Sequence, residues 1–157
     1  MRIVASLFML ALSFPALSRE VRLTHMRPQQ QVHLQSYGEP SASLIDLLAP
    51  FLATHGFEEA QRHVKVSTRT EVAVFVPTSD HEWDEASDAI AMKGTFNNLT
   101  VTYCTWFYPW ESNDLKGAGR AAKLLADLRT FLHSLPAPNI EVTDSKVDSS
   151  QSCGNAF

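Results

Sequence analysis

The stretch that decides the fold runs from Leu99 to Trp110 and reads Leu-Thr-Val-Thr-Tyr-Cys-Thr-Trp-Phe-Tyr-Pro-Trp. Its β-branched and aromatic side chains suit a pleated, half-buried surface, so the stretch predicts a central strand of a sheet. Alternate side chains of a strand point to opposite faces. We expect the core to lie beneath the more apolar face, which consists of Leu99, Val101, Tyr103 and Phe107.

A tight turn is predicted at Asn97-Asn98, directly before this strand. Asparagine tolerates the positive φ angles that a two-residue hairpin turn requires. Residues 89–96 are therefore expected to form the antiparallel partner strand, with Phe96 opposite Leu99.

Apolar residues at three- and four-residue spacing predict a helix over residues 44–52. Ser41 or Ser43 can cap its first turn, and Gly56 follows its last turn, where a left-handed residue is expected. Pro50 lies inside the pattern and should kink the helix or split it.

A second helix is predicted between Asp114, which can cap it, and Pro136, which stops it. Its apolar positions follow helical spacing and are Ala118, Ala121, Ala122, Leu125, Leu128, Leu132 and Leu135. Residues 140–143 then alternate apolar and polar, which predicts a final strand.

The first half of the chain contains further strand patterns. Residues 21–26 and 32–37 alternate apolar and polar, and Pro28 separates them, so they form either one edge strand with a bulge or two short strands. Residues 64–76 predict one long or bent strand, whereas residues 57–63 are polar and ambiguous. A short acidic helix is expected after Ser79, which has the spacing of a capping box.

This order of elements predicts an α+β fold, with an antiparallel sheet and two main helices on one face. It resembles the split βαββαβ arrangement of ferredoxin-like folds, with the short acidic helix as an insertion. The resemblance concerns architecture alone, and this architecture supports many unrelated functions.

The first residues have the three parts of a secretory signal peptide. A positive Met1-Arg2 start precedes an apolar run, and small residues stand before a cleavage point after Ser18. A membrane anchor is the alternative, but the run is shorter than the roughly 20 residues that a spanning helix needs. We expect a signal peptide at 1–18, one α+β domain at 19–145, a polar tail at 146–157, and a periplasmic or secreted protein without an integral membrane segment after cleavage.

The net charge of −4 offers no basic footprint for nucleic acid or an anionic membrane surface. The two cysteines, Cys104 and Cys153, form an even count in a chain expected to reach an oxidising compartment, which favours one disulfide. The alternative is a buried free thiol at Cys104 and a disordered tail around Cys153.

Patterns that carry chemistry are sparse, and we predict no catalytic residue, metal or cofactor. The six histidines lack the spacing of a zinc protease, and the chain has neither a G-x-S-x-G nor an S-x-x-K motif. Residues 116–120 could cradle a phosphate at a helix start, although close packing of that turn explains their glycines better. The acidic residues at 80–88 lack the spacing of a calcium loop and fit a solvated helix face.

Three aromatic residues stand on the face away from the expected core: Trp106, Tyr108 and Trp110. Aromatic side chains are enriched as anchors of recognition surfaces, so these residues are the predicted partner-binding site. The alternative is a second packed layer. The sequence thus predicts a small exported non-enzymatic domain of the accessory, inhibitor or immunity type, which binds another exported or cell-envelope protein. The competing hypothesis is a small-ligand binder or an enzyme that uses Cys104 or histidines in a pocket.

Overall fold

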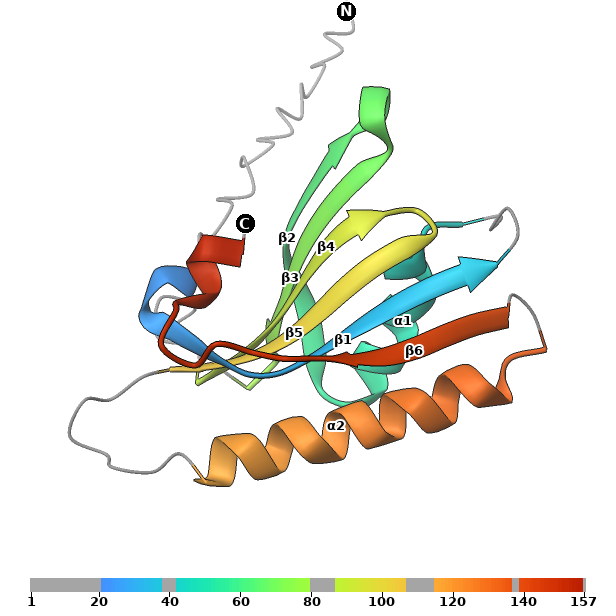
Figure 1. The fold of residues 1–157 in the computed structure, drawn as a ribbon. Helices are drawn as coiled ribbons and strands as arrows, with labels where there is room; N and C mark the ends of the chain where they lie inside the picture. Colours follow the sequence, from blue (N-terminus) through green and yellow to red (C-terminus); the bar gives the residue numbers. More distant parts are fainter. Residues whose placement is uncertain (1–20, 38–41, 80–86, 107–114, 137–138, 157) are drawn as a thin grey trace, which may run out of the picture.

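The computed structural model describes residues 21–37, 42–79, 87–106, 115–136 and 139–156, which form an antiparallel sheet with two helices (Figure 1). The strands are β1 (Met26–Tyr37), β2 (Phe57–Lys65), β3 (Thr70–Pro77), β4 (Asp88–Thr95), β5 (Asn98–Trp106) and β6 (Asn139–Ser145). The helices are α1 (Leu44–Thr54) and α2 (Leu115–Ser134), and the short 3-10 turns are η1 (Leu23–His25), η2 (Val66–Thr68) and η4 (Cys153–Ala156).

The strands lie in the order β2-β3-β4-β5-β1-β6, and every neighbouring pair is antiparallel. The predicted α+β class with an antiparallel sheet and two helices is confirmed. The ferredoxin-like arrangement is wrong, because the sheet has six strands and a different order. Helix α1 connects β1 to β2 along the chain. In the sheet, these two strands are separated by β5, β4 and β3.

The region of β2 and β3 explains the incorrect strand count. Only Phe57 is a large apolar residue in the first half of β2, so residues 57–63 show no clear alternation. The predicted single strand over residues 64–76 is wrong, because η2 divides it and Arg69 reverses the chain with a φ angle of 49°. A left-handed arginine is uncommon, and no glycine or proline marks this turn in the sequence.

Strand β5 is central, between β4 and β1, as its composition predicts. The hairpin with β4 places Leu99 opposite Gly94, so the expected pairing of Leu99 with Phe96 is wrong. The carbonyl groups of the turn are used elsewhere, since the Phe96 carbonyl accepts from the Leu44 N–H at 3.2 Å and the Asn97 carbonyl accepts from the Ser36 N–H at 2.8 Å. These bonds tie the hairpin turn to β1 and to the start of α1.

The strand predicted from residue 21 onward is wrong in its first part, because residues 23–25 form η1. From Met26, β1 is one strand with a bulge between Pro28 and Gln30, but it pairs with both β5 and β6 and is therefore not an edge strand. Helix α1 begins at the predicted cap, where the Ser43 hydroxyl accepts from the Asp46 N–H at 3.2 Å. Gly56 follows it with a φ angle of 80°. Of the two outcomes expected at Pro50, a kink or a split, the split is wrong, because α1 is one uninterrupted helix.

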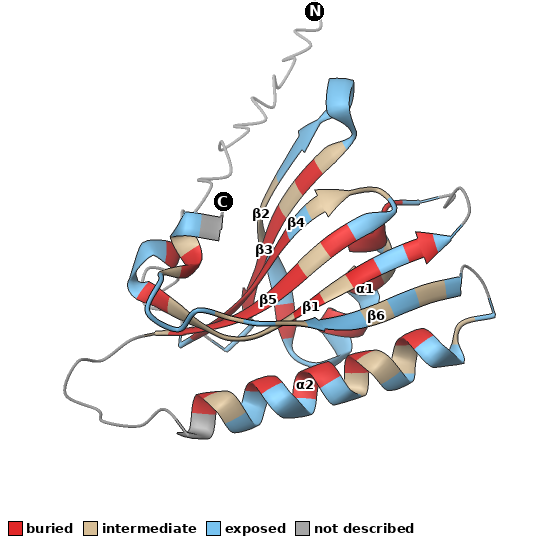
Figure 2. Cartoon of the chain, in the orientation of Figure 1, coloured by how far each residue is buried: buried red, intermediate tan, exposed pale blue. Residues whose placement is uncertain are grey.

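Two apolar clusters pack on opposite faces of the sheet. The larger one joins α1 and α2 to the face that contains Leu99, Val101 and Tyr103, and Figure 2 shows the buried stripe of α2 turned toward the sheet. The smaller one lies on the other face, beneath the two ends of the described chain. Its buried members are Val21, Leu23, Met26, Val74, Val76, Ala89, Ala91, Cys104 and Cys153.

Candidate functional site

The predicted aromatic site is described in part, because Tyr108 and Trp110 lie in residues 107–114, outside the described chain. Trp106 ends β5 on the face opposite the helices, pairs with Met26 of β1, and is partly exposed. Its ring packs edge-on against His25, with ring centroids 5.4 Å apart and an angle of 82° between the planes. Trp106 therefore combines contact with the smaller core cluster and access to solvent.

The two cysteines lie within disulfide distance beside this residue. Their sulfur atoms are 2.12 Å apart, and both residues are almost fully buried. The bond joins β5 to η4, 49 positions later in the chain, and η4 packs against η1. Neither sulfur is a free thiol. The competing hypothesis of thiol chemistry at Cys104 therefore lacks the thiolate nucleophile that it requires.

Gly154 permits the close approach of η4 to η1. A Cβ atom at this position would lie 2.7 Å from the Thr24 Cγ2 atom and 3.0 Å from the Thr24 backbone nitrogen. Any larger residue would push these two turns apart. The sequence Cys153-Gly154 thus supplies both the covalent link and the space that the contact needs.

An open hollow of about 430 Å³ lies between these segments and Trp106. Its walls come from both ends of the described chain and from the end of β5, and consist of Thr24, His25, Arg27, Trp106, Ser150, Gln151, Ser152 and Asn155. We call this surface the Trp106 corner. It offers one large aromatic ring, one guanidinium group and several hydroxyl and amide groups, a combination suited to contact with another protein.

Hydrogen bonds fix the C-terminal wall of the Trp106 corner. The Arg27 Nη1 atom donates to the Ser149 carbonyl at 2.8 Å. The Asp148 carboxylate accepts from the Ser150 N–H at 3.0 Å and from the Gln151 side-chain amide at 3.1 Å. Hydrogen bonds from the Ser150 hydroxyl and N–H lower the pKa of Asp148, so this carboxylate stays ionised as the acceptor that organises the turn.

Sequence reasoning identified Trp106 but not His25, Arg27 or the C-terminal wall. His25 and Arg27 lie in the alternating pattern of residues 21–37 and carry no motif, and the structure places His25 in η1 and Arg27 in β1. The predicted link between Cys104 and Cys153 is the signal that could have placed residues 150–155 near Trp106, because positions 104 and 106 lie on the same face of the strand.

The glycine-rich start of α2 has a structural role. Arg120 donates from Nε and Nη2 to the Asp88 carboxylate, at 2.8 and 2.9 Å, and Gly117 is buried. This bidentate pair fastens α2 to β4. The buried Gly117 agrees with the predicted close packing, whereas Gly119 is exposed and a Cβ atom there would meet nothing within 4 Å, so close packing does not explain it. Burial, together with the nearby Asp88 charge, raises the pKa of the Tyr103 hydroxyl.

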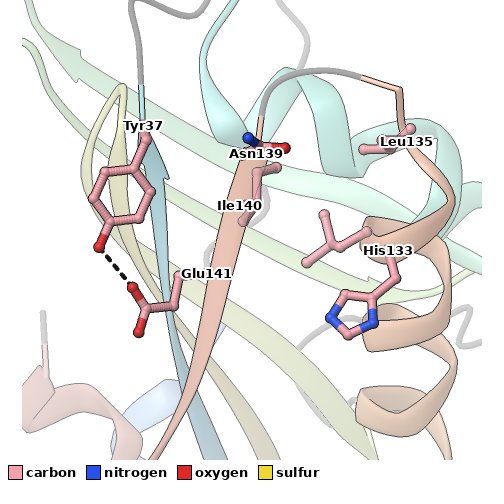
Figure 3. A pocket seen from close by; sticks show the side chains of 7 residues that line it. Tyr37, His133, Leu135, Asn139, Ile140 and Glu141 are labelled. Carbon is pink, nitrogen blue, oxygen red and sulfur yellow. Dashed lines mark hydrogen bonds between the residues drawn. The ribbon is translucent and has the colours of Figure 1, made fainter.

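A second hollow, of about 580 Å³, lies at the β6 edge (Figure 3). The Tyr37 hydroxyl donates to Glu141 at 2.6 Å, and this bond raises the pKa of Tyr37. Figure 3 shows this pair on one side of β6 and His133 on the other, so the polar groups do not converge on one point. Within the described ranges, no group of three histidine, cysteine or acidic residues could hold a metal ion.

Comparisons with protein-family models, with curated proteins and with solved structures found no match. Of the helices in the described part of the chain, none has the length and apolar character needed to cross a membrane.

Proposed function

We propose that this protein is a small exported binding domain that contacts another exported or cell-envelope protein through the Trp106 corner. The observation that carries the proposal is the partly exposed Trp106 at the wall of a hollow that also presents Arg27. Tryptophan and arginine are the residue types most enriched among the strongest contacts of protein interfaces. An accessory, inhibitor or immunity role is consistent with such a surface.

Preorganisation supports this use of the corner. The cysteine pair and the hydrogen bonds of Arg27 and Asp148 hold the C-terminal wall in place before a partner arrives. A wall that is already ordered loses less conformational entropy on binding. The cysteine pair also supports export, because disulfides persist in oxidising compartments.

The test is capture of partners from periplasmic and culture extracts with wild type, Trp106→Ala and Tyr37→Ala. Tyr37 is the matched control, since it is an aromatic residue that is 57% exposed and lies outside the Trp106 corner. We expect Trp106→Ala to lose proteins that wild type and Tyr37→Ala both retain. Thermal unfolding identifies any general loss of fold. Equal recovery by a folded Trp106→Ala variant would contradict the proposal.

A small-molecule function is the competing proposal, favoured by the volume of the same hollow. Sites for small ligands commonly span roughly 300–1,000 Å³ but are mostly enclosed, whereas this hollow is open. Stabilisation of the wild-type protein, but not of Trp106→Ala, by compounds from a metabolite library would favour the competing proposal.

A further inference from the structure

Strand β2 forms one edge of the sheet, and within the described chain it pairs only with β3. Figure 1 shows the β2–β3 hairpin rising beyond the other strands. Val64 near its tip is 46% exposed, and residues 58, 59, 63 and 65 are exposed as well. Long exposed edges invite pairing with another strand, and proteins usually blunt them with charges, especially lysine.

The charges of β2 are separated by sign along the strand. The carboxylates of Glu58 and Glu59 lie in the first half, whereas the cations Arg62 and Lys65, together with the ring nitrogens of His63, lie in the second. An antiparallel copy of this strand would bring each acidic half against a basic half. A parallel copy would place like charges together, so the charge order selects one orientation.

The faces of β2 have the same symmetry as its charges. Phe57 belongs to the core cluster beneath the helices, and Arg62 is on this face too, since it bonds to Asp46 of α1. The bulge between Glu59 and Gln61 brings Glu59 to the same face, where its carboxylate lies 2.8 Å from the Arg62 guanidinium. By alternation, Val64 shares this face, while Glu58 and His63 point to the opposite face.

We propose that β2 pairs with β2 of a second copy of this chain, antiparallel and about a twofold axis between Ala60 and Gln61. This register sets Glu58 opposite His63, Glu59 opposite Arg62, and Phe57 opposite Val64, with both members of each pair on the same face. Lys65 then lies diagonally across from Glu58. Each pair occurs twice because the interface is isologous, and the two sheets become continuous across the axis.

The opposite edge of the sheet lacks this complementarity. Strand β6 pairs only with β1 among the described strands, and its charged residues are Glu141 and Asp144. Residues 139–145 include no basic residue, so antiparallel pairing of two β6 strands would place no cation of the strand against its acidic residues. The charges therefore single out β2 as the self-pairing edge.

The experiment is sedimentation equilibrium of the full chain and of three variants at several concentrations. We expect wild type to dimerise, and Glu58→Lys to raise the dimer dissociation constant by about tenfold or more, because it replaces the attraction between Glu58 and Lys65 across the axis with repulsion. The double variant Glu58→Lys/His63→Glu should restore dimerisation by placing a carboxylate opposite the new lysine. Glu141→Lys makes the same charge change at the other edge and should dimerise like wild type.

Two results would overturn the proposal. One is a wild-type protein that stays monomeric throughout the concentration series. The other is a dimer whose dissociation constant Glu58→Lys leaves unchanged, or raises by no more than Glu141→Lys does. Circular dichroism of each variant checks that the proteins compared are folded. The proposal does not rest on the Trp106 corner, whose residues take no part in this interface.

Discussion

Removing the link between Cys104 and Cys153 should destabilise this protein strongly, because the bond closes a long loop. For a sequence separation of 49 between the cysteines, the chain-entropy relation gives about 4 kcal/mol at 25 °C for the lost restriction of the unfolded chain. The double variant Cys104→Ala/Cys153→Ala should therefore unfold at a urea concentration lower by about 2 M, for a denaturant slope of about 2 kcal/mol/M.

The assay is urea unfolding followed by tryptophan fluorescence and by circular dichroism. Wild-type protein with a dithiol reductant serves as the second arm, and its unfolding midpoint should fall by a similar amount. A midpoint that moves by less than about 0.3 M in both arms would refute the reasoning, since the link would then restrict little of the unfolded chain. Hydrogen exchange of residues 150–155 should rise in the variant more than that of β5, because η4 loses its attachment to the sheet.

Three further outcomes follow from contacts elsewhere in the fold. Ser43→Ala removes the cap of α1 and should lower the free energy of unfolding by about 1 kcal/mol in chemical denaturation. Arg120→Ala leaves the buried Asp88 carboxylate without its bidentate partner. Because the arginine side chain is 46% exposed, we expect the free energy of unfolding to fall by about 2 kcal/mol, less than for a fully buried pair, again in chemical denaturation. Because the pKa of Tyr103 is raised in the folded state, the native protein keeps this proton after the unfolded chain has released it, so stability should fall as pH rises above about 10. Denaturation across this pH range should show a smaller fall for Tyr103→Phe.

Local sequence patterns predicted those elements whose burial in the fold matches their amino-acid composition. Strand β5 is apolar enough to occupy the centre of the sheet, and α2 has a continuous apolar stripe. The cap at Ser43 and the left-handed Gly56 follow from local chemistry, so the limits of α1 could be predicted as well.

The edge strand and the overall topology could not be predicted in this way. Most of β2 faces solvent, so residues 57–63 lack the alternation that a half-buried strand shows. The turn between β2 and β3 depends on a left-handed Arg69 rather than on glycine or proline. Without β2 as a separate strand, the predicted strands number five instead of six, and the order β2-β3-β4 on one side of the sheet could not be foreseen.

The candidate site likewise combines a residue that local patterns predict with residues that only the tertiary structure brings together. Trp106 could be selected from the sequence because aromatic side chains are enriched as anchors of recognition surfaces, but Arg27 and Gln151 reach it only through tertiary structure. The cysteine pair is the long-range restraint that the sequence offered, and it correctly brings the C-terminal segment to β5.

The central claim is that the Trp106 corner contacts another protein, and site-specific photocrosslinking in producing cells tests it most directly. A photoreactive residue replaces Gln151, at the wall of the corner, or Ala126, an exposed position on α2. The account predicts a discrete heavier adduct from position 151 only, which disappears when Trp106→Ala is combined with it. The absence of an adduct at position 151, or the same adducts from both positions, would contradict the account.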